Sequence, residues 1–180
     1  MRARISLFGL VAAAVISNTV VAWAAGIENL VEGLAGLSHP GPYSASASEV
    51  ARDFLSSMLL GPLGAIAFGF VGAMIFLGAA FLVVARTTGP RSFVIAGASA
   101  SLAWIACGLC ARFLPEHVGS SWFNAFEVVL CLEPFAFRPE AAIAAALGAL
   151  VAGPVAGWTY SRALNTKVGP WHEFARRSPR

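Results

Sequence analysis

The chain has 180 residues, of which 58% are apolar and 12% carry a charge. This composition excludes an ordinary soluble domain, in which about a quarter of the residues are charged. The net charge of +3 does not indicate nucleic-acid binding, because membrane topology accounts for the positions of the basic residues.

The apolar residues gather in four blocks that contain no Asp, Glu, Lys, Arg or His. A helix needs about 20 residues to cross the hydrocarbon core of a bilayer, which is about 30 Å thick. Lipid offers no partner to free backbone groups, and the blocks lack strand alternation, so we expect an all-α integral membrane bundle. The expected spans of this single domain (residues 1–180) are 5–25, 58–85, 93–114 and 139–161.

The charged residues separate by sign between the two sides of this bundle. Nine of the twelve basic residues fall on the side that holds both termini and residues 86–91, together with one acidic residue, Glu173. The other eight acidic residues fall on the opposite side. This positive-inside pattern predicts that both termini are cytoplasmic. Only one basic residue is a lysine, and Ala and Gly are abundant, which we interpret as a GC-rich bacterial genome and a bacterial inner membrane.

The first expected span, residues 5–25, has an alternative interpretation. Arg2 and Arg4, the apolar run and the sequence Ala22-Trp23-Ala24 are also typical of a cleavable signal peptide. The run is longer than the apolar region of most signal peptides and contains Asn18, so we favour a retained span. Cleavage would leave three spans and a periplasmic N-terminus.

Residues 26–37 follow the first span and have an amphipathic pattern. Their apolar residues recur at helical spacing, while acidic and amide residues take the other positions. This segment either extends the first span or lies on the periplasmic surface as a short helix. The apolar positions are Ile27, Leu30, Val31 and Leu34.

A second amphipathic piece precedes the second span. Ser46 followed three residues later by Glu49 is the pattern of a helix-capping box. We expect a periplasmic surface helix to begin there, with Val50 and Phe54 on one face. Pro62 removes one helical hydrogen bond, so we expect this helix to bend into the membrane at that point.

The remaining elements alternate between the two sides of the membrane. Residues 86–91 are a short link, so the second and third spans should form an antiparallel hairpin. Residues 120–132 are strongly apolar but too short to span the membrane. Glu127 and Glu133 keep this segment near water, so we expect an interfacial periplasmic helix. The basic tail, residues 162–180, is expected to lie on anionic lipid of the cytoplasmic leaflet.

Small residues spaced four apart mark the surfaces through which membrane helices associate, because close packing holds such helices together. Glycine is the sharper signal in an alanine-rich chain. We expect Gly61, Gly69, Gly153 and Gly157 to lie in helix contacts, and Asn18 to hydrogen-bond across the bundle. A further stripe in the third span comprises Ser99, Ala103, Cys107 and Ala111.

Cys107, Cys110 and Cys131 form the one pattern with chemical content. They could act as a thiol–disulfide relay, and a four-span chain with both ends inside resembles in topology the disulfide-bond oxidases of the bacterial inner membrane. Those enzymes need two cysteine pairs, and this chain has three cysteines. The pair also lies near the C-terminal end of an expected helix in apolar surroundings, which disfavours a thiolate. A structural Cys110–Cys131 disulfide in the oxidising periplasm is the stronger expectation.

No other pattern points to catalysis. The spacing of the histidines and acidic residues fits no metal site, and the four apolar blocks hold no charged residue for a coupled carrier and no catalytic triad. We therefore expect a non-catalytic subunit or accessory protein, without cofactor or metal, that binds another membrane protein or a second copy of itself in the bilayer. The alternatives are a small transporter or channel component and the thiol relay.

Overall fold

The computed structural model describes residues 6–38, 46–85, 89–113, 130 and 139–165. Four α-helices make up these residues, and each is long and apolar enough to cross a membrane. The described part of the chain contains no strand, so the prediction of an all-helical protein with four candidate spans is confirmed. The helices are α1 (Leu7–Ser38), α2 (Ala47–Val83), α3 (Pro90–Phe113) and α6 (Pro139–Asn165).

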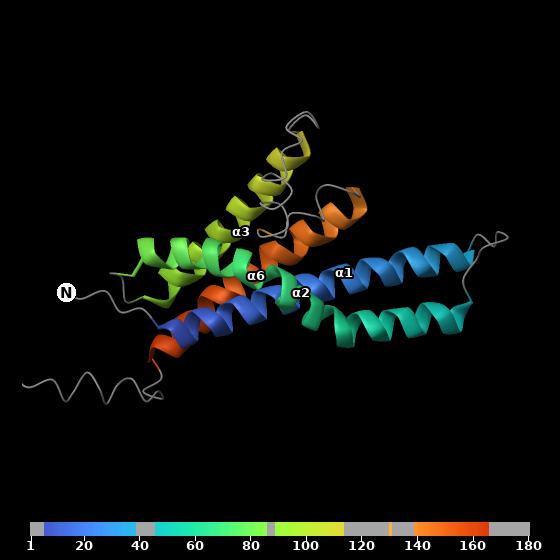
Figure 1. The fold of residues 1–180 in the computed structure, drawn as a ribbon, viewed down its shortest axis with the longest axis horizontal. Helices are drawn as coiled ribbons and strands as arrows, with labels where there is room; N and C mark the ends of the chain where they lie inside the picture. Colours follow the sequence, from blue (N-terminus) through green and yellow to red (C-terminus); the bar gives the residue numbers. More distant parts are fainter. Residues whose placement is uncertain (1–5, 39–45, 86–88, 114–129, 131–138, 166–180) are drawn as a thin grey trace, which may run out of the picture.

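The helices alternate in direction. α1 packs against both α2 and α6, α6 also packs against α3, and the contact between α2 and α3 is smaller. The beginnings of α1 and α3 and the ends of α2 and α6 lie at one end of the bundle (Figure 1). At the other end, the α1–α2 pair and the α3–α6 pair point in different directions (Figure 1).

An aromatic cluster closes the end of the bundle near the N-terminus of α1, which we call the aromatic end. Phe81 of α2 stacks on Tyr160 of α6 with ring centroids 4.4 Å apart, and Phe93 of α3 meets both rings at 5.9 and 5.2 Å. All three side chains are buried. The backbone N–H of Ser6 donates to the Tyr160 hydroxyl at 3.2 Å, so the cluster joins all four helices.

α1 is one continuous helix of 32 residues. Residues 26–37 therefore extend the first apolar block rather than forming a separate surface helix. At about 1.5 Å per residue, the helix is about 48 Å long, which exceeds the hydrocarbon core by about 18 Å. The excess lies at the end opposite the aromatic cluster, where α1 runs beside the first part of α2 (Figure 1).

α2 begins with the predicted capping box. The Ser46 hydroxyl accepts from the backbone N–H of Glu49 at 3.3 Å, and the Ser46 N–H donates to the Glu49 carboxylate at 2.7 Å. The backbone N–H groups of Ser46 and Glu49, which have no partner within the helix, are thereby satisfied. Val50 is buried and Phe54 half-buried, so these two residues share the inner face of the helix, as the sequence predicts.

α2 continues through Pro62 as one helix, so the expected surface helix is the first part of a longer element. Because proline has no N–H, the Met58 carbonyl loses its regular helical partner. The indole Nε1 of Trp23, on α1, donates a hydrogen bond to that carbonyl at 3.2 Å. α1 thus supplies the partner that Pro62 removes, while α2 changes direction along its length (Figure 1).

α3 and α6 approach each other backbone to backbone. A methyl group on Gly97 would overlap the Gly153 carbonyl, one on Gly153 would overlap the Gly97 carbonyl, and one on Gly157 would overlap the Phe93 carbonyl. Side chains larger than hydrogen do not fit at these three glycines. The contact face of α3 therefore runs through Phe93, Gly97 and Ser101, all of them buried.

The prediction of which face of α3 contacts a neighbouring helix is wrong. Ser99 and Ala103 are exposed, and Cys107 is half-buried. The spacing of four is correct, but the contact face follows the register of Phe93 and Gly97 instead. In a helix where small residues occur on every side, residue size alone does not select the face that meets a neighbour.

Candidate functional site

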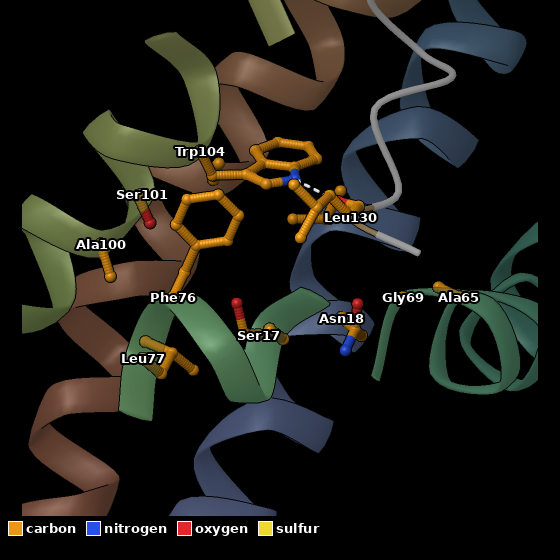
Figure 2. Close-up of a pocket in the computed structure, with 13 residues that line it drawn as sticks. Ser17, Asn18, Ala65, Gly69, Phe76, Leu77, Ala100, Ser101, Trp104 and Leu130 are labelled. Carbon is orange, nitrogen blue, oxygen red and sulfur yellow. Dashed lines mark hydrogen bonds between the residues drawn. The ribbon is translucent and has the colours of Figure 1, made fainter. Parts of the chain in front are cut away.

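A cavity of about 80 Å³ lies between the four helices (Figure 2). Its volume would accommodate a few water molecules or a small polar group, since one water occupies about 30 Å³ in the liquid. Among the described residues that line it, none has an ionisable side chain. The lining consists of Ser17, Asn18, Val21, Ala65, Gly69, Ala73, Phe76, Leu77, Ala100, Ser101, Trp104, Leu130 and Ala149.

The cavity lies deep within the apolar part of the bundle. Asn18 is 12 residues from Ser6, and Trp104 is 14 residues from Pro90 at the start of α3. At the helical rise, both lie about 20 Å from the aromatic end. A hydrocarbon core of about 30 Å would therefore enclose the cavity, some 10 Å from the opposite membrane surface.

Leu130 enters the bundle from the connection between α3 and α6. Its exposed fraction is 5%, and its backbone lies against Gly72 of α2, where a methyl group would come within 3.0 Å of the Leu130 carbonyl oxygen. The indole Nε1 of Trp104 donates to that oxygen at 2.9 Å (Figure 2). This hydrogen bond gives a partner to a backbone carbonyl whose residue is buried away from water.

The interfacial periplasmic helix expected at residues 120–132 lies, apart from Leu130, outside the described residues and stays a prediction. Leu130 is the one described residue of that segment, and it lies in the interior. An apolar segment of this length can cover the bundle or enter it, and hydropathy does not distinguish the two. The sequence feature that could have indicated a backbone segment inside the bundle is Trp104, because a tryptophan in an apolar block needs an acceptor for its indole N–H.

The polar edge of the cavity belongs to α1. The Ser17 hydroxyl and the Asn18 amide oxygen are drawn on the side of Phe76 and Leu130 (Figure 2). The Asn18 amide nitrogen donates to the Ala14 carbonyl of the same helix at 3.0 Å. The hydrogen bonds of the described residues do not include one from Asn18 across the bundle, so this residue borders the cavity instead of linking two helices.

The four predicted packing glycines have different surroundings. Gly153 and Gly157 lie in the contact between α6 and α3, and Gly69 is buried beside the cavity. Gly61 is half-buried, and a methyl group there would lie 3.9 Å from the Ala22 side chain, so this contact is loose. Sequence reasoning missed Gly148, where a methyl group would lie 2.7 Å from Ala24 of α1.

The cysteines do not form a described pair. Cys107 is half-buried and Cys110 is exposed on the last part of α3. Cys131 lies outside the described residues, so a Cys110–Cys131 disulfide stays a prediction. Within the described ranges, no group of three His, Cys, Asp or Glu residues could hold a metal ion.

The second feature of interest is the arm, by which we mean residues 26–38 of α1 and residues 46–58 of α2. Its helices meet through glycines. A methyl group on Gly33 would lie 2.7 Å from a Val50 methyl, and one on Gly26 would overlap the Met58 side chain. These contacts fix which sides of the two helices face outward.

One flank of the arm is apolar and the other acidic. Each residue of a helix is rotated by about 100° from the residue before it. Gly26 and Gly33 of α1 face α2, so Ile27 and Leu34, which follow them, point to one flank of the arm. In the antiparallel α2, the residues that follow Val50 and Ser57 point to the same flank. Glu32, Glu49 and Asp53 are turned to the opposite flank. The apolar flank is exposed, with 54% of Ile27, 61% of Val31, 51% of Leu34 and 58% of Leu55 accessible.

The arm, the cavity and the α3–α6 contact are the distinctive features of the described bundle. Comparisons with protein-family models, with curated proteins and with solved structures find no match for the chain. A function must therefore be inferred from the geometry of the chain itself.

Proposed function

We propose that the chain crosses the bacterial inner membrane four times, with both termini in the cytoplasm. The alternating helix directions support this topology, since both ends of the described chain lie at the aromatic end, where Arg91 and Arg162 are also found (Figure 1). The acidic residues of the arm lie at the other end. The packing of α1 between α2 and α6 supports its retention as a span rather than its removal as a signal peptide.

Within this topology we propose a non-catalytic accessory subunit that binds a second, different membrane protein. The apolar flank of the arm carries the proposal. Val31 and Leu34 lie beyond Glu28, about 36 and 40 Å along the helix from Leu7, and thus outside a hydrocarbon core of about 30 Å. Lipid chains do not cover apolar side chains at that level, and an exposed apolar surface there is typical of a protein interface.

The chemistry of the arm also describes its partner. An apolar strip from Ile27 to Leu34 accepts an apolar helix face, as in helix-in-groove recognition. Glu32, Glu49 and Asp53 lie on the opposite flank of the arm and favour a partner that carries basic residues beyond its apolar face. A second copy of this chain would instead bring two acidic arms together, which disfavours self-association through the arm.

Site-specific photo-crosslinking in native membranes tests this proposal. A photo-reactive residue at Val31, Leu34 or Leu55 should give one common heterologous product. The matched controls are Asn29 and Ser56, which are exposed on the other flank of the same arm. The product should be lost in a Val31→Gln, Leu34→Gln variant whose circular dichroism and thermal unfolding match those of the wild type.

Three outcomes of this experiment contradict the proposal. Equal crosslinking from both flanks would mean that the apolar strip does not define the interface. A product of twice the chain's own mass would identify a homodimer. Crosslinks to lipid alone at Val31 and Leu34 would place the arm inside the bilayer.

The central cavity favours a second candidate, a small transporter or channel component. Its polar edge at Ser17 and Asn18 lies at membrane depth, as a permeation path requires. In a cysteine-free background, Asn18→Cys should react with a small water-soluble thiol reagent. Leu150→Cys is the control, because Leu150 is exposed to lipid next to the lining residue Ala149. Equal inertness of both variants would remove this candidate.

A further inference from the structure

A groove of about 640 Å³ opens on the outer surface of the bundle between α3 and α6, at the aromatic end. It is separate from the central cavity and from the arm. It combines basic side chains with exposed apolar ones, and the described residues of its lining include no acidic one. The groove is lined by Pro90, Arg91, Val94, Ile95, Trp158, Ser161 and Arg162.

Two arginines from different helices border this groove. Arg91 lies in the first turn of α3 and Arg162 in the last turn of α6, and both are exposed. The guanidinium carbon of Arg162 lies 5.1 Å from the centroid of the Trp158 ring, within the range of a cation–π contact. This contact restrains the Arg162 guanidinium beside the groove, and the N-terminal dipole of α3 adds positive potential on the Arg91 side.

The apolar lining continues from the arginines toward the middle of the bundle. Ile95 is 66% exposed and Trp158 50% exposed, and Val155 and Val151 continue the same outward face of α6. The groove thus presents positive charge at the end of the spans and an apolar surface directly beneath it. An alternative role for Arg162 is to offset the negative end of the α6 dipole, but that role would explain Arg162 alone. It would not explain Arg91 or the exposed tryptophan between them.

We infer that this groove binds one anionic phospholipid, with its phosphate between Arg91 and Arg162 and an acyl chain along Ile95 and Trp158. Guanidinium groups pair with phosphate oxygens through charge-assisted hydrogen bonds, and basic pockets between membrane helices on the cytoplasmic side suit anionic headgroups. The inference rests on the proposed membrane topology but not on the proposed partner of the arm. It also differs from a general contact of the basic tail (residues 162–180) with lipid, because Arg91, Ile95 and Trp158 lie outside that tail.

Native mass spectrometry of the full chain in detergent tests this site with phosphatidylglycerol and phosphatidylcholine as probes. We expect one phosphatidylglycerol to bind more tightly than any phosphatidylcholine. Arg91→Gln and Arg162→Gln should each weaken that binding roughly tenfold, the usual effect of losing a hydrogen bond to a charged group. Arg52→Gln is the matched control, since it removes the same charge from an exposed arginine on the arm.

The alternatives give different results. An equal loss in Arg52→Gln would reduce the effect to net charge, and equal binding of both lipids would remove headgroup recognition. Displacement of the lipid by millimolar inorganic phosphate would mean that the groove binds free anions. Residues 166–180 are unchanged in all variants, so they cannot produce a difference between them. Crosslinking from the arm is read out separately, which keeps the failure of either proposal distinguishable.

Discussion

The α3–α6 pair and the α1–α2 pair both meet at glycines, yet the two contacts differ in what the glycines face. Gly97, Gly153 and Gly157 face backbone, with a carbonyl directly opposite each missing side chain. In the arm, Gly26 and Gly33 face the side chains of Met58 and Val50. A side chain can move to another rotamer, whereas a helix backbone cannot move without displacing the whole helix.

This difference indicates different roles for the two pairs. The α3–α6 contact lies in apolar blocks without charges, where close backbone approach holds helices together in lipid. The α1–α2 contact continues beyond such a block into a region with acidic residues. The first pair therefore sets the architecture of the bundle, while the second presents a surface. Three measurements test this difference between the two helix pairs.

The largest effect is expected from Gly153→Leu. The new side chain would meet the Gly97 carbonyl and the Ser101 hydroxyl, so α3 and α6 must separate. We expect a loss of about 3 kcal/mol or more in the free energy of unfolding in detergent. Gly64→Leu and Leu82→Ala are the controls, because a methyl group on Gly64 meets nothing within 4 Å and Leu82 is 59% exposed. Equal stability of the three variants would remove the backbone contact as the basis of the architecture.

An intermediate effect is expected from Trp104→Phe, compared with Trp23→Phe. Both indoles donate to a backbone carbonyl, that of Leu130 at 2.9 Å and that of Met58 at 3.2 Å. Leu130 is buried, so its carbonyl would lose its partner away from water, at a cost of about 1–3 kcal/mol. Trp23 is 47% exposed and Met58 is half-buried, so the Met58 carbonyl lies nearer the surface of the bundle than that of Leu130 and should lose less. Chemical denaturation should rank the two variants in that order, and the reverse order would contradict the difference between interior and arm.

The smallest effect concerns the start of the arm in α2. Hydrogen bonds from Ser46 to the Glu49 carboxylate, mainly from the backbone N–H and secondly from the hydroxyl, hold the pKa of Glu49 below its ordinary value of 4.5. A carboxyl whose pKa is lowered by folding contributes stability above its unfolded pKa and loses it as the pH falls through the folded pKa. Amide exchange at residues 47–50 should therefore be slower in the wild type than in Glu49→Gln at neutral pH. The two should converge below the lowered pKa, and a gap that persists in acid would exclude the carboxylate as its cause.

The elements of this bundle were predictable from the sequence, while their contacts were largely not. Blocks of about 20 apolar residues without charges have few stable conformations in lipid other than a helix, and the capping box at Ser46 is a local interaction. The contact face of α3 was missed because small residues occur all around that helix. The insertion of Leu130 and the hydrogen bond from Trp23 to the Met58 carbonyl depend on residues distant in sequence, for which periodicity has no signal.

The hydrogen bond from Ser6 to Tyr160 has a consequence for how the bundle is made. It joins α1 to α6, the first and last of the described helices, and α1 packs along α6 through Gly9 and Ala13. During translation, that side of α1 stays exposed to lipid or to insertion factors until α6 has left the ribosome. The bundle can close only after α6 has been made, so a chain that stops before Tyr160 leaves α1 half-covered and open to quality-control proteases.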